Sequence, residues 1–242
     1  MRSPKRLEVK LVNDAKVIFL PDIHAPYHSP ALLKRAIEIV QVTKPDYIVQ
    51  LGDWADAYAF SSWDSSREML TPAKEIAETR RVMATFWADV QAAAPNAKCY
   101  SLAGNHNQRI SKMVIRLAPA LEAFMDKPIT EFHQFKNVIS LEHEKDELVL
   151  VSPEWGKIVC IHGFLSKAGD HTRYFLENTV RGHSHRASVS YIRKKDRTLF
   201  EIEAGCLIDI NSRAFEYRQA LTSQWVPALA VLDSNGPRVI PL

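Results

Sequence analysis

Acidic and histidine side chains follow several apolar runs of this 242-residue chain, close to the point where each run ends. Asp22 and His24 come directly after the apolar run at residues 16–20. They stand two residues apart, so in an extended segment both side chains project to the same side. Asp53 follows a second run that ends at Leu51, and Gly52 gives the backbone the freedom to turn sharply there. Asp53 is therefore the residue that we expect at the centre of a site.

Histidines occupy the same kind of position in the rest of the chain. Five of the nine histidines lie directly after predicted strands or in glycine-containing turns: His24, His106, His162, His183 and His185. Mixed imidazole and carboxylate ligands suit Mn, Fe, Zn or Ni, and the absence of nearby thiolates argues against a structural zinc site. These residues offer more ligands than one ion can accept. Two ions about 3.5–4 Å apart, bridged by one carboxylate, would use them all and would hold a phosphate group against an attacking hydroxide. Asp53 is the natural bridge.

The elements that must position these residues follow from hydrophobic periodicity. Residues 30–43 have one apolar helical face, and with the strands before and after them they predict a β-α-β unit. Its acidic loops then lie at the carboxyl ends of parallel strands, where open α/β sheets place their sites. Residues 57–70 lack a clear period and predict a loop that could overhang the site. The remaining patterns predict helices near 71–94, 109–125 (interrupted near Pro119) and 167–178, and strands near 97–102, 147–151, 157–161, 188–192, 198–203 and 227–233.

Composition limits the partners and the compartment. The three cysteines are widely separated and form no C-x-x-C pair, so neither a disulfide framework nor a thiolate zinc site is expected, and a reducing cytoplasm fits best. We find no signal peptide and no apolar segment long enough to cross a membrane, so no membrane partner is expected. A formal net charge of +3 does not by itself dictate a polyanionic partner. Basic residues between Arg181 and Arg197 could guide a nucleic-acid backbone, although a solvated hairpin face explains them more simply.

Five sequence blocks, taken in order, resemble the calcineurin-like metallophosphoesterase superfamily. The blocks are Asp22-x-His24, Gly52-Asp53-x-x-Asp56, Gly104-Asn105-His106, His162-Gly163 and Gly182-His183-x-His185, and the resemblance spans residues 16–186. A lone G-D-x-x-D would carry little weight, but five blocks in this order make a chance match improbable. The later block Gly205-Cys206-Leu207, together with the step from Asn105-His106 to Arg109, resembles the small phosphoesterases of phages and prophages. If the chain is phage-encoded, the expected compartment is the host cytoplasm.

The resemblance implies a fold and a set of roles. The implied fold is a four-layer α/β/β/α sandwich of two mixed β-sheets flanked by helices, here as a single domain over residues 1–242 with a helical and loop insertion around 57–94. The implied cofactors are two divalent transition-metal ions, with manganese the expected ion and Fe, Zn, Ni or Co as alternatives. One ion would be held by Asp22, His24, Asp53 and His185, and the other by Asp53, Asn105, His162 and His183. His106 would contact phosphate oxygens and protonate or stabilise the leaving group, while a metal-bound hydroxide attacks phosphorus. Phosphate contacts are expected from Asn105, His106 and Arg109, although Arg109 could equally be a solvated residue at the start of a helix.

Two positions beside these blocks need separate treatment. The family usually has an acid after Gly-Asn-His, whereas this chain has Asn107, which could accept a hydrogen bond from His106 but carries no charge. Without that charge, His106 would be a weaker proton donor. Asp56 is expected to be a hydrogen-bond partner within its loop, and we leave it out of the ligand set.

The predicted function is hydrolysis of a phosphate ester, with a nucleic acid or nucleotide as the preferred substrate class. A phosphatase that acts on phosphoproteins or small phosphate monoesters is the first alternative. A catalytically silent scaffold that keeps the fold and the ions is the second. The oligomeric state is left open.

Overall fold

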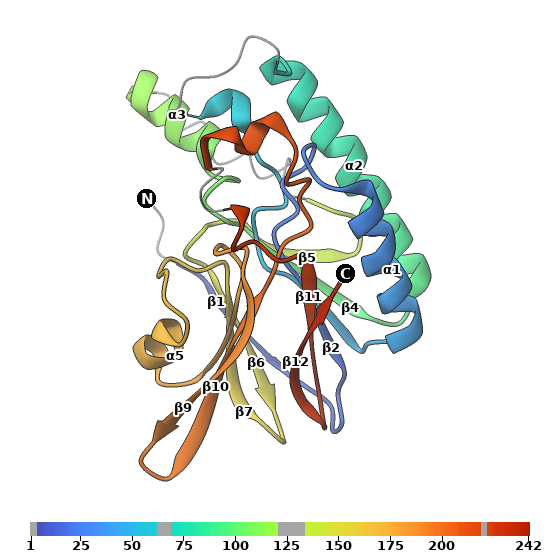
Figure 1. Ribbon diagram of the computed structural model, residues 1–242, viewed down its shortest axis with the longest axis vertical. Coiled ribbons are helices and arrows are strands. Elements are labelled where there is room, and N and C mark those ends of the chain that lie inside the picture. Colours follow the sequence, from blue (N-terminus) through green and yellow to red (C-terminus); the bar gives the residue numbers. More distant parts are fainter. Residues whose placement is uncertain (1–3, 62–68, 121–133, 219–221) are drawn as a thin grey trace.

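Two six-stranded sheets form the centre of the computed structural model, which describes residues 4–61, 69–120, 134–218 and 222–242 (Figure 1). The first sheet has the order β12-β11-β2-β3-β4-β5, and the second has the order β1-β6-β7-β8-β10-β9. The first sheet comprises β2 (Val17–Leu20), β3 (Tyr47–Gln50), β4 (Lys98–Leu102), β5 (Val138–Leu141), β11 (Ala228–Asp233) and β12 (Gly236–Pro241). The second comprises β1 (Arg6–Lys10), β6 (Glu147–Ser152), β7 (Gly156–Ile161), β8 (Asn178–Arg181), β9 (Ala187–Lys194) and β10 (Arg197–Ala204). Both sheets are mixed, as predicted.

The central strands are apolar on both faces because both faces are covered. In β2, Val17 and Phe19 pack into the core between the two sheets, whereas Ile18 and Leu20 pack into the core beneath the helices. All four side chains have no exposed surface. A strand buried on both sides reads as a continuous apolar run, and this is why residues 16–20 show no alternation.

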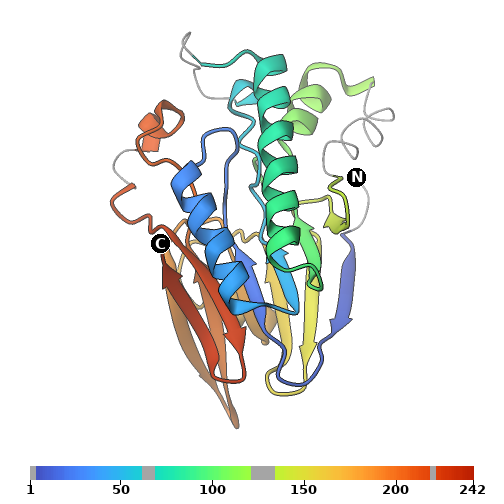
Figure 2. The same ribbon diagram turned by 90° about the vertical axis from the view of Figure 1, so that its right-hand side faces the viewer.

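Two long helices cover the outer face of the first sheet (Figure 2). Helix α1 (Pro30–Thr43) begins with Pro30, and the side chain of Ser29 accepts a hydrogen bond from the Leu32 amide. Helix α2 (Pro72–Ala93) packs beside α1 and buries Met83, Phe86, Trp87 and Val90. The residues expected as an insertion around 57–94 thus include this helix and a short 3₁₀ helix, η1 (Tyr58–Phe60).

The outer face of the second sheet carries a thinner helical layer. Helix α5 (Asp170–Phe175) has six residues, and its Phe175 packs against Val149, Val159 and Ile161. The molecule is therefore an α/β/β/α sandwich, as predicted, with most of its helical mass on one side. Helix α3 (Arg109–Leu117) and the 3₁₀ helix η3 (Arg213–Arg218) lie above the sheets (Figure 1).

The carboxyl ends of five strands meet at one edge of the sandwich. Strands β2, β3 and β4 are parallel neighbours in the first sheet, and β7 and β8 are parallel neighbours in the second. The loops that leave these ends touch across the two sheets: the His162 ring lies 3.0 Å from the Leu51 carbonyl oxygen, and the His183 amide donates to the Asp22 carboxylate. All five sequence blocks therefore converge at this edge.

The predicted strands are confirmed, and four strands were not anticipated. Three of them, β1, β5 and β12, lie at sheet edges, and the fourth is β8, which directly follows the helix expected over 167–178. That expectation was too long, because the helix ends at Phe175. The helix expected over 109–125 is described as α3 to Leu117, and residues 121–133 lie outside the described residues, as do residues 62–68 of the expected loop. Within the described part of the chain, none of the helices combines the length and apolar character that crossing a bilayer requires.

Candidate metal centre

Asp22, His24 and His185 form a first group, which we call the buried cluster. The His185 Nε2 atom lies 2.9 Å from Asp22 Oδ2 and 3.2 Å from His24 Nε2. The relative exposures of the three residues are 0%, 1% and 8%. Asp22 and His24 come from the loop after β2, and His185 comes from the loop after β8. His24 and His185 are 161 positions apart in the sequence.

Asp53, Asn105, His162 and His183 form a second group, which we call the open cluster. The His162 Nε2 atom lies 3.1 Å from both Asp53 Oδ2 and Asn105 Oδ1. The His183 Nδ1 atom lies 3.0 Å from Asn105 Oδ1 and 3.2 Å from His162 Nε2. Asp53 and His162 are buried, whereas His183 is exposed to solvent.

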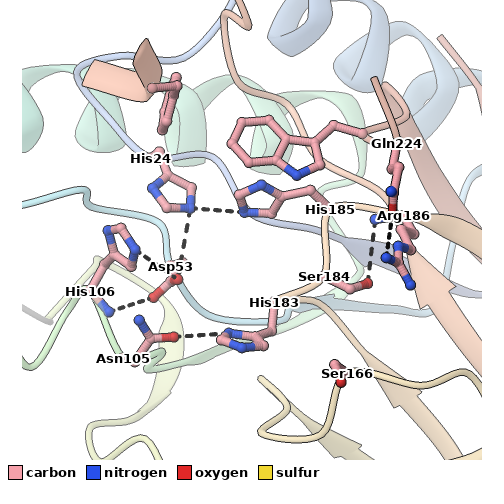
Figure 3. Close-up of a pocket in the computed structure, with 12 residues that line it drawn as sticks. His24, Asp53, Asn105, His106, Ser166, His183, Ser184, His185, Arg186 and Gln224 are labelled. Atoms are coloured by element: carbon pink, nitrogen blue, oxygen red, sulfur yellow. Dashed lines mark hydrogen bonds and ion pairs between the residues drawn. The ribbon is translucent and has the colours of Figure 1, made fainter. Parts of the chain in front are cut away.

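One oxygen of Asp53 lies between the two clusters. Asp53 Oδ2 is 3.1 Å from His162 Nε2. It is 3.7 Å from His24 Nε2 (Figure 3). No other carboxylate oxygen in the described part of the site has ion-pair contacts to imidazoles of both clusters within 4.0 Å. The geometry thus puts Asp53 at the position that a bridging ligand needs.

The donor atoms fit divalent transition-metal ions. Two ligands at right angles around an ion, each about 2.1 Å from it, lie about 3.0 Å apart, which is close to the separations of 2.9–3.2 Å within each cluster. The rings also turn unprotonated nitrogens inward. His24 Nδ1 donates to Asp56 Oδ2 at 2.6 Å and His162 Nδ1 donates to the Leu51 carbonyl, so in each neutral ring the Nε2 lone pair faces the cluster. Such a set of imidazole, carboxylate and amide oxygen donors suits Mn, Fe, Zn, Co or Ni.

Two glycines make room for the carboxylates. A Cβ atom on Gly104 would collide with Asp53 Oδ1, and a Cβ atom on Gly182 would collide with Asp22 Oδ1. Each carboxylate instead accepts a backbone hydrogen bond from the facing loop, at 2.8 Å from the His106 amide to Asp53 and at 3.0–3.1 Å from the His183 amide to Asp22. The glycines of these two sequence blocks are therefore required by close approach of backbone to side chain.

Backbone strain is concentrated at the same place. Four of the residues that form the clusters have left-handed backbone conformations: His24, Asp53, His183 and His185, with φ values of 53°, 46°, 68° and 58°. Such conformations cost roughly 1–3 kcal/mol for a non-glycine residue and persist only when the surroundings impose them. The left-handed backbone conformations direct these four side chains into the two clusters.

The side chain next to His106 is the acid Asp56 and not the amide Asn107. The Asn107 side chain could have accepted a hydrogen bond from His106, but it accepts one from the Gly104 amide at 2.8 Å instead. His106 Nδ1 lies 3.1 Å from the Asp56 carbonyl oxygen and 3.3 Å from its carboxylate. The loop geometry explains why Asp56, and not Asn107, contacts His106. The Asn107 side chain turns back to bond within its own turn, whereas Asp56 reaches His106 from the loop after β3.

Asp56 also holds Arg109, which was expected to contact phosphate. Arg109 Nη1 donates to the Asp56 carboxylate at 3.0 Å, and Nη2 donates to His106 Nε2 at 3.1 Å. The guanidinium neutralises Asp56, which leaves no reason to seat a cation between Asp56, His24 and His106. Asp56 was expected to be a hydrogen-bond partner within its own loop, but its carboxylate instead bonds His24 and Arg109, which follow β2 and β4.

Electrostatics couple the acids and imidazoles. Burial would raise the pKa of Asp53, but the imidazoles of His162, His106 and His24 outweigh burial and hold that pKa well below its usual value. Burial would likewise lower the pKa of His162, but the carboxylates of Asp53 and Asp22 raise it to about 9. The pKa of His183 is lowered to about 4, first by desolvation and then by His162. The open cluster therefore holds a proton on His162 whenever no cation replaces it.

Two cavities meet at the open cluster. The first, of about 240 Å³, is polar and is bordered by His24, Asp53 and His106 together with Arg186 and Gln224 (Figure 3). The second, of about 610 Å³, has aromatic walls, and both cavities are bordered by Asn105 and His183. The sequence contained no local signal for the C-terminal contributors to the first cavity, which are Phe215, Gln224 and Trp225.

The basic residues between 181 and 197 do not form one surface. Arg181 is fully buried and donates to Glu201 and Glu203 at 2.9 and 2.6 Å. Arg197 lies 3.4 Å from Glu177, whereas Arg186 borders the polar cavity. A nucleic-acid groove built from this segment as a unit therefore has no support.

Comparisons with known proteins identify a matching family and several similar chains. A sequence profile for calcineurin-like phosphoesterases matches residues 15–220. The chain is 25% identical over 250 residues to the Gene 54 protein of Mycobacterium phage D29, with 93% of this chain and 91% of that protein covered. It is 22% identical over 255 residues to the Gene 54 protein of Mycobacterium phage L5, with the same coverage of both chains. A solved structure of a Vps29 single mutant from Entamoeba histolytica aligns with a TM-score of 0.46 and 10% identity, and covers 94% of this chain and 98% of that one.

Proposed function

The chain belongs to the calcineurin-like phosphoesterase family, and we propose that it hydrolyses phosphate esters with two divalent transition-metal ions. The observation that carries this proposal is the position of Asp53 Oδ2 between two groups of donors, 3.7 Å from His24 and 3.1 Å from His162. A single ion would use the donor atoms of only one of the two clusters. Manganese is the ion that we expect, with Fe, Zn, Ni or Co as alternatives.

In this proposal each cluster holds one ion. Asp22, His24 and His185 hold the first ion, Asn105, His162 and His183 hold the second, and Asp53 contacts both. Asp56 and the Leu51 carbonyl fix the rings of His24 and His162 so that their Nε2 atoms remain available. Bound ions of this kind polarise a phosphoryl oxygen, lower the pKa of water and neutralise developing charge.

His106 is the proposed catalytic residue outside the ligand set. Its Nδ1 faces the Asp56 carbonyl oxygen and so carries a hydrogen, and its Nε2 lies 4.0 Å from Asp53 Oδ2, at the border of the polar cavity. From there the imidazolium form of the ring, in which Nε2 carries a proton in place of the Arg109 contact, can protonate the oxygen that leaves phosphorus. Arg109, which donates to Nε2, helps to position the ring; a direct contact from Arg109 to phosphate stays a prediction.

We also propose that residues 1–242 act as one domain. The family profile covers residues 15–220, and the flanking strands β1 and β12 are both incorporated in the sheets. The preferred substrate class is a nucleic acid or nucleotide, and phosphoproteins or small phosphate monoesters are the alternatives.

Metal stoichiometry and substrate choice test this function together. We expect the purified protein to bind two Mn²⁺ ions per chain at saturation and, once loaded, to hydrolyse bis-p-nitrophenyl phosphate. Fewer than two bound ions per chain would contradict the two-ion proposal. Strong activity on p-nitrophenyl phosphate with none on the diester or on single-stranded DNA would favour a monoesterase.

One variant distinguishes an enzyme from a catalytically silent scaffold. His106→Ala should abolish hydrolysis while both ions stay bound, because His106 lies outside the ligand set. A wild-type protein that is inactive with several metals and substrates would favour the scaffold.

A further inference from the structure

The second cavity joins the open cluster to an exposed aromatic wall. Its lining runs from Asn105, His162 and His183 to Phe164 and Tyr174, and its volume of about 610 Å³ is within the usual range for small-ligand sites. Phe164 is 56% exposed and Tyr174 is 66% exposed. Their rings lie 5.4 Å apart in an edge-to-face arrangement, so the two rings do not stack on each other.

The exposed position of Phe164 is built into the fold. His171 is fully buried, and its Nε2 accepts hydrogen bonds of 3.0 Å from the amides of both Phe164 and Leu165. The His171 ring also contacts the Phe164 ring edge-to-face, with 4.9 Å between the ring centroids. A buried side chain thus fixes the backbone of a residue whose aromatic ring points outward, two positions after His162.

The two acidic residues that line this cavity are paired with basic residues. Glu144 is paired with Lys112 at 2.7 Å, and Glu147 is paired with Arg6 at 3.2 Å. Neither acid is therefore free to repel a phosphate ester at the open cluster. The wall itself is apolar and aromatic, which suits an uncharged planar group better than a second phosphate.

The geometry points to a base-stacking subsite: a nucleobase attached to the reacting phosphate lies against Phe164 and Tyr174, while the phosphate lies at the open cluster. This inference rests on the proposed phosphoesterase function and specifies its substrate. Stacking on aromatic side chains is sequence-tolerant, because every base presents a planar face. The subsite therefore favours nucleotide esters in general and does not select one base.

Two esters with the same leaving group isolate the subsite. Thymidine 5′-(p-nitrophenyl phosphate) and methyl p-nitrophenyl phosphate both release p-nitrophenolate, and they differ only in the nucleoside. We expect the wild type to hydrolyse the nucleoside ester with a kcat/KM at least about fivefold higher, the lower end of the effect of one stacked base. Phe164→Ala and Tyr174→Ala should each reduce this ratio, with kcat/KM for the methyl ester unchanged.

Matched variants separate stacking from general effects. Phe164→Trp should keep the preference for the nucleoside ester, whereas Phe164→Leu, which keeps apolar bulk without a flat ring, should lose most of it. Tyr191→Ala removes a similarly exposed ring, 64% exposed on β9 and outside the cavity lining, and should leave the ratio unchanged. A wild type without any preference, or variants that lower kcat/KM for both esters equally, would overturn the subsite while leaving the phosphoesterase function intact.

A binding measurement covers the case in which neither diester is hydrolysed, as expected for a monoesterase or a catalytically silent scaffold. Isothermal titration calorimetry would then compare thymidine 5′-phosphate with inorganic phosphate. Tighter binding of the nucleotide that is lost in Phe164→Ala would support the subsite, and equal affinities of the two ligands in the wild type would overturn it.

Discussion

The buried cluster and the open cluster share Asp53 but differ in their access to solvent. His24 and Asp22 are buried and His185 is nearly so, whereas the open cluster ends in the exposed His183 and borders both cavities. The supporting contacts differ as well, because His24 is fixed by a carboxylate and His162 by a backbone carbonyl. The comparison suggests a division of roles in which the buried cluster retains its ion and the open cluster presents its ion to substrate.

The largest effect is expected where the two clusters join. Asp53→Asn keeps the size of the side chain but removes its charge, so it should weaken both ions and reduce metal content from two per chain toward none. Loss of a partner outside the ligand set already costs about 10- to 100-fold in metal affinity or activity, and loss of this ligand should exceed that range. Metal content by mass spectrometry after gel filtration checks the result; loss of only one ion would mean that Asp53 is not the bridge.

Single-cluster variants sharpen the division. His24→Ala should weaken the ion of the buried cluster, and His183→Ala should weaken the ion of the open cluster, each leaving about one ion per chain. In the wild type, a chelator should remove the open-cluster ion first because His183 is exposed. Calorimetric titration of each variant with Mn²⁺ gives the number of sites, and identical loss patterns in the two variants would remove the distinction between the clusters.

Proton release should mark the open cluster. The pKa of His162, raised to about 9 by Asp53 and Asp22, means that this ring is protonated at neutral pH in the metal-free protein. An ion must displace that proton, so its affinity should fall by roughly tenfold for each pH unit below about 9 if His162 dominates. Calorimetry in buffers with different ionisation enthalpies counts the released proton. A count that does not change in His162→Ala would show that another group is responsible.

Asp56 should influence the buried cluster from outside it. Asp56→Asn removes the charged acceptor that lies 2.6 Å from His24 Nδ1, and we expect a loss of about 10- to 100-fold in affinity for the buried-cluster ion. Asp89→Asn makes the same chemical change on the exposed surface of α2 and serves as the control. Equal metal affinities in the two variants would show that the Asp56 contact has no role in ligand orientation.

The smallest effect on activity is expected at Asn107. Asn107→Asp restores the acid that the family usually has, but the side chain closes its own turn at Gly104 and does not contact His106. We therefore expect no gain in activity. The buried charge should instead lower the free energy of unfolding by about 1–3 kcal/mol, measured by urea denaturation, and an increase in kcat would show that the new carboxylate reaches His106.

Much of the architecture could be predicted because burial leaves a local pattern. The run at residues 16–20 is apolar throughout because β2 is covered on both faces, and the apolar stripe of residues 30–43 marks the buried side of α1. The edge strands β1, β5 and β12 were missed because they are partly exposed, so their sequences lack such a run. Residues 178–181 were missed because this short strand lies between the expected helix at 167–178 and the block that begins at Gly182.

The sequence by itself determined which side chains could hold ions, because their types and their positions after apolar runs are local properties. Only the tertiary structure decided which of them meet. His24 and His185 are 161 residues apart, and their contact depends on how the two sheets pack and where their parallel strands end. The same packing made Asp56 the partner of His106 in place of Asn107, buried Arg181, and set the Phe164 ring beside the open cluster. Hydrophobic periodicity reports that a face is covered, but it does not report what covers it.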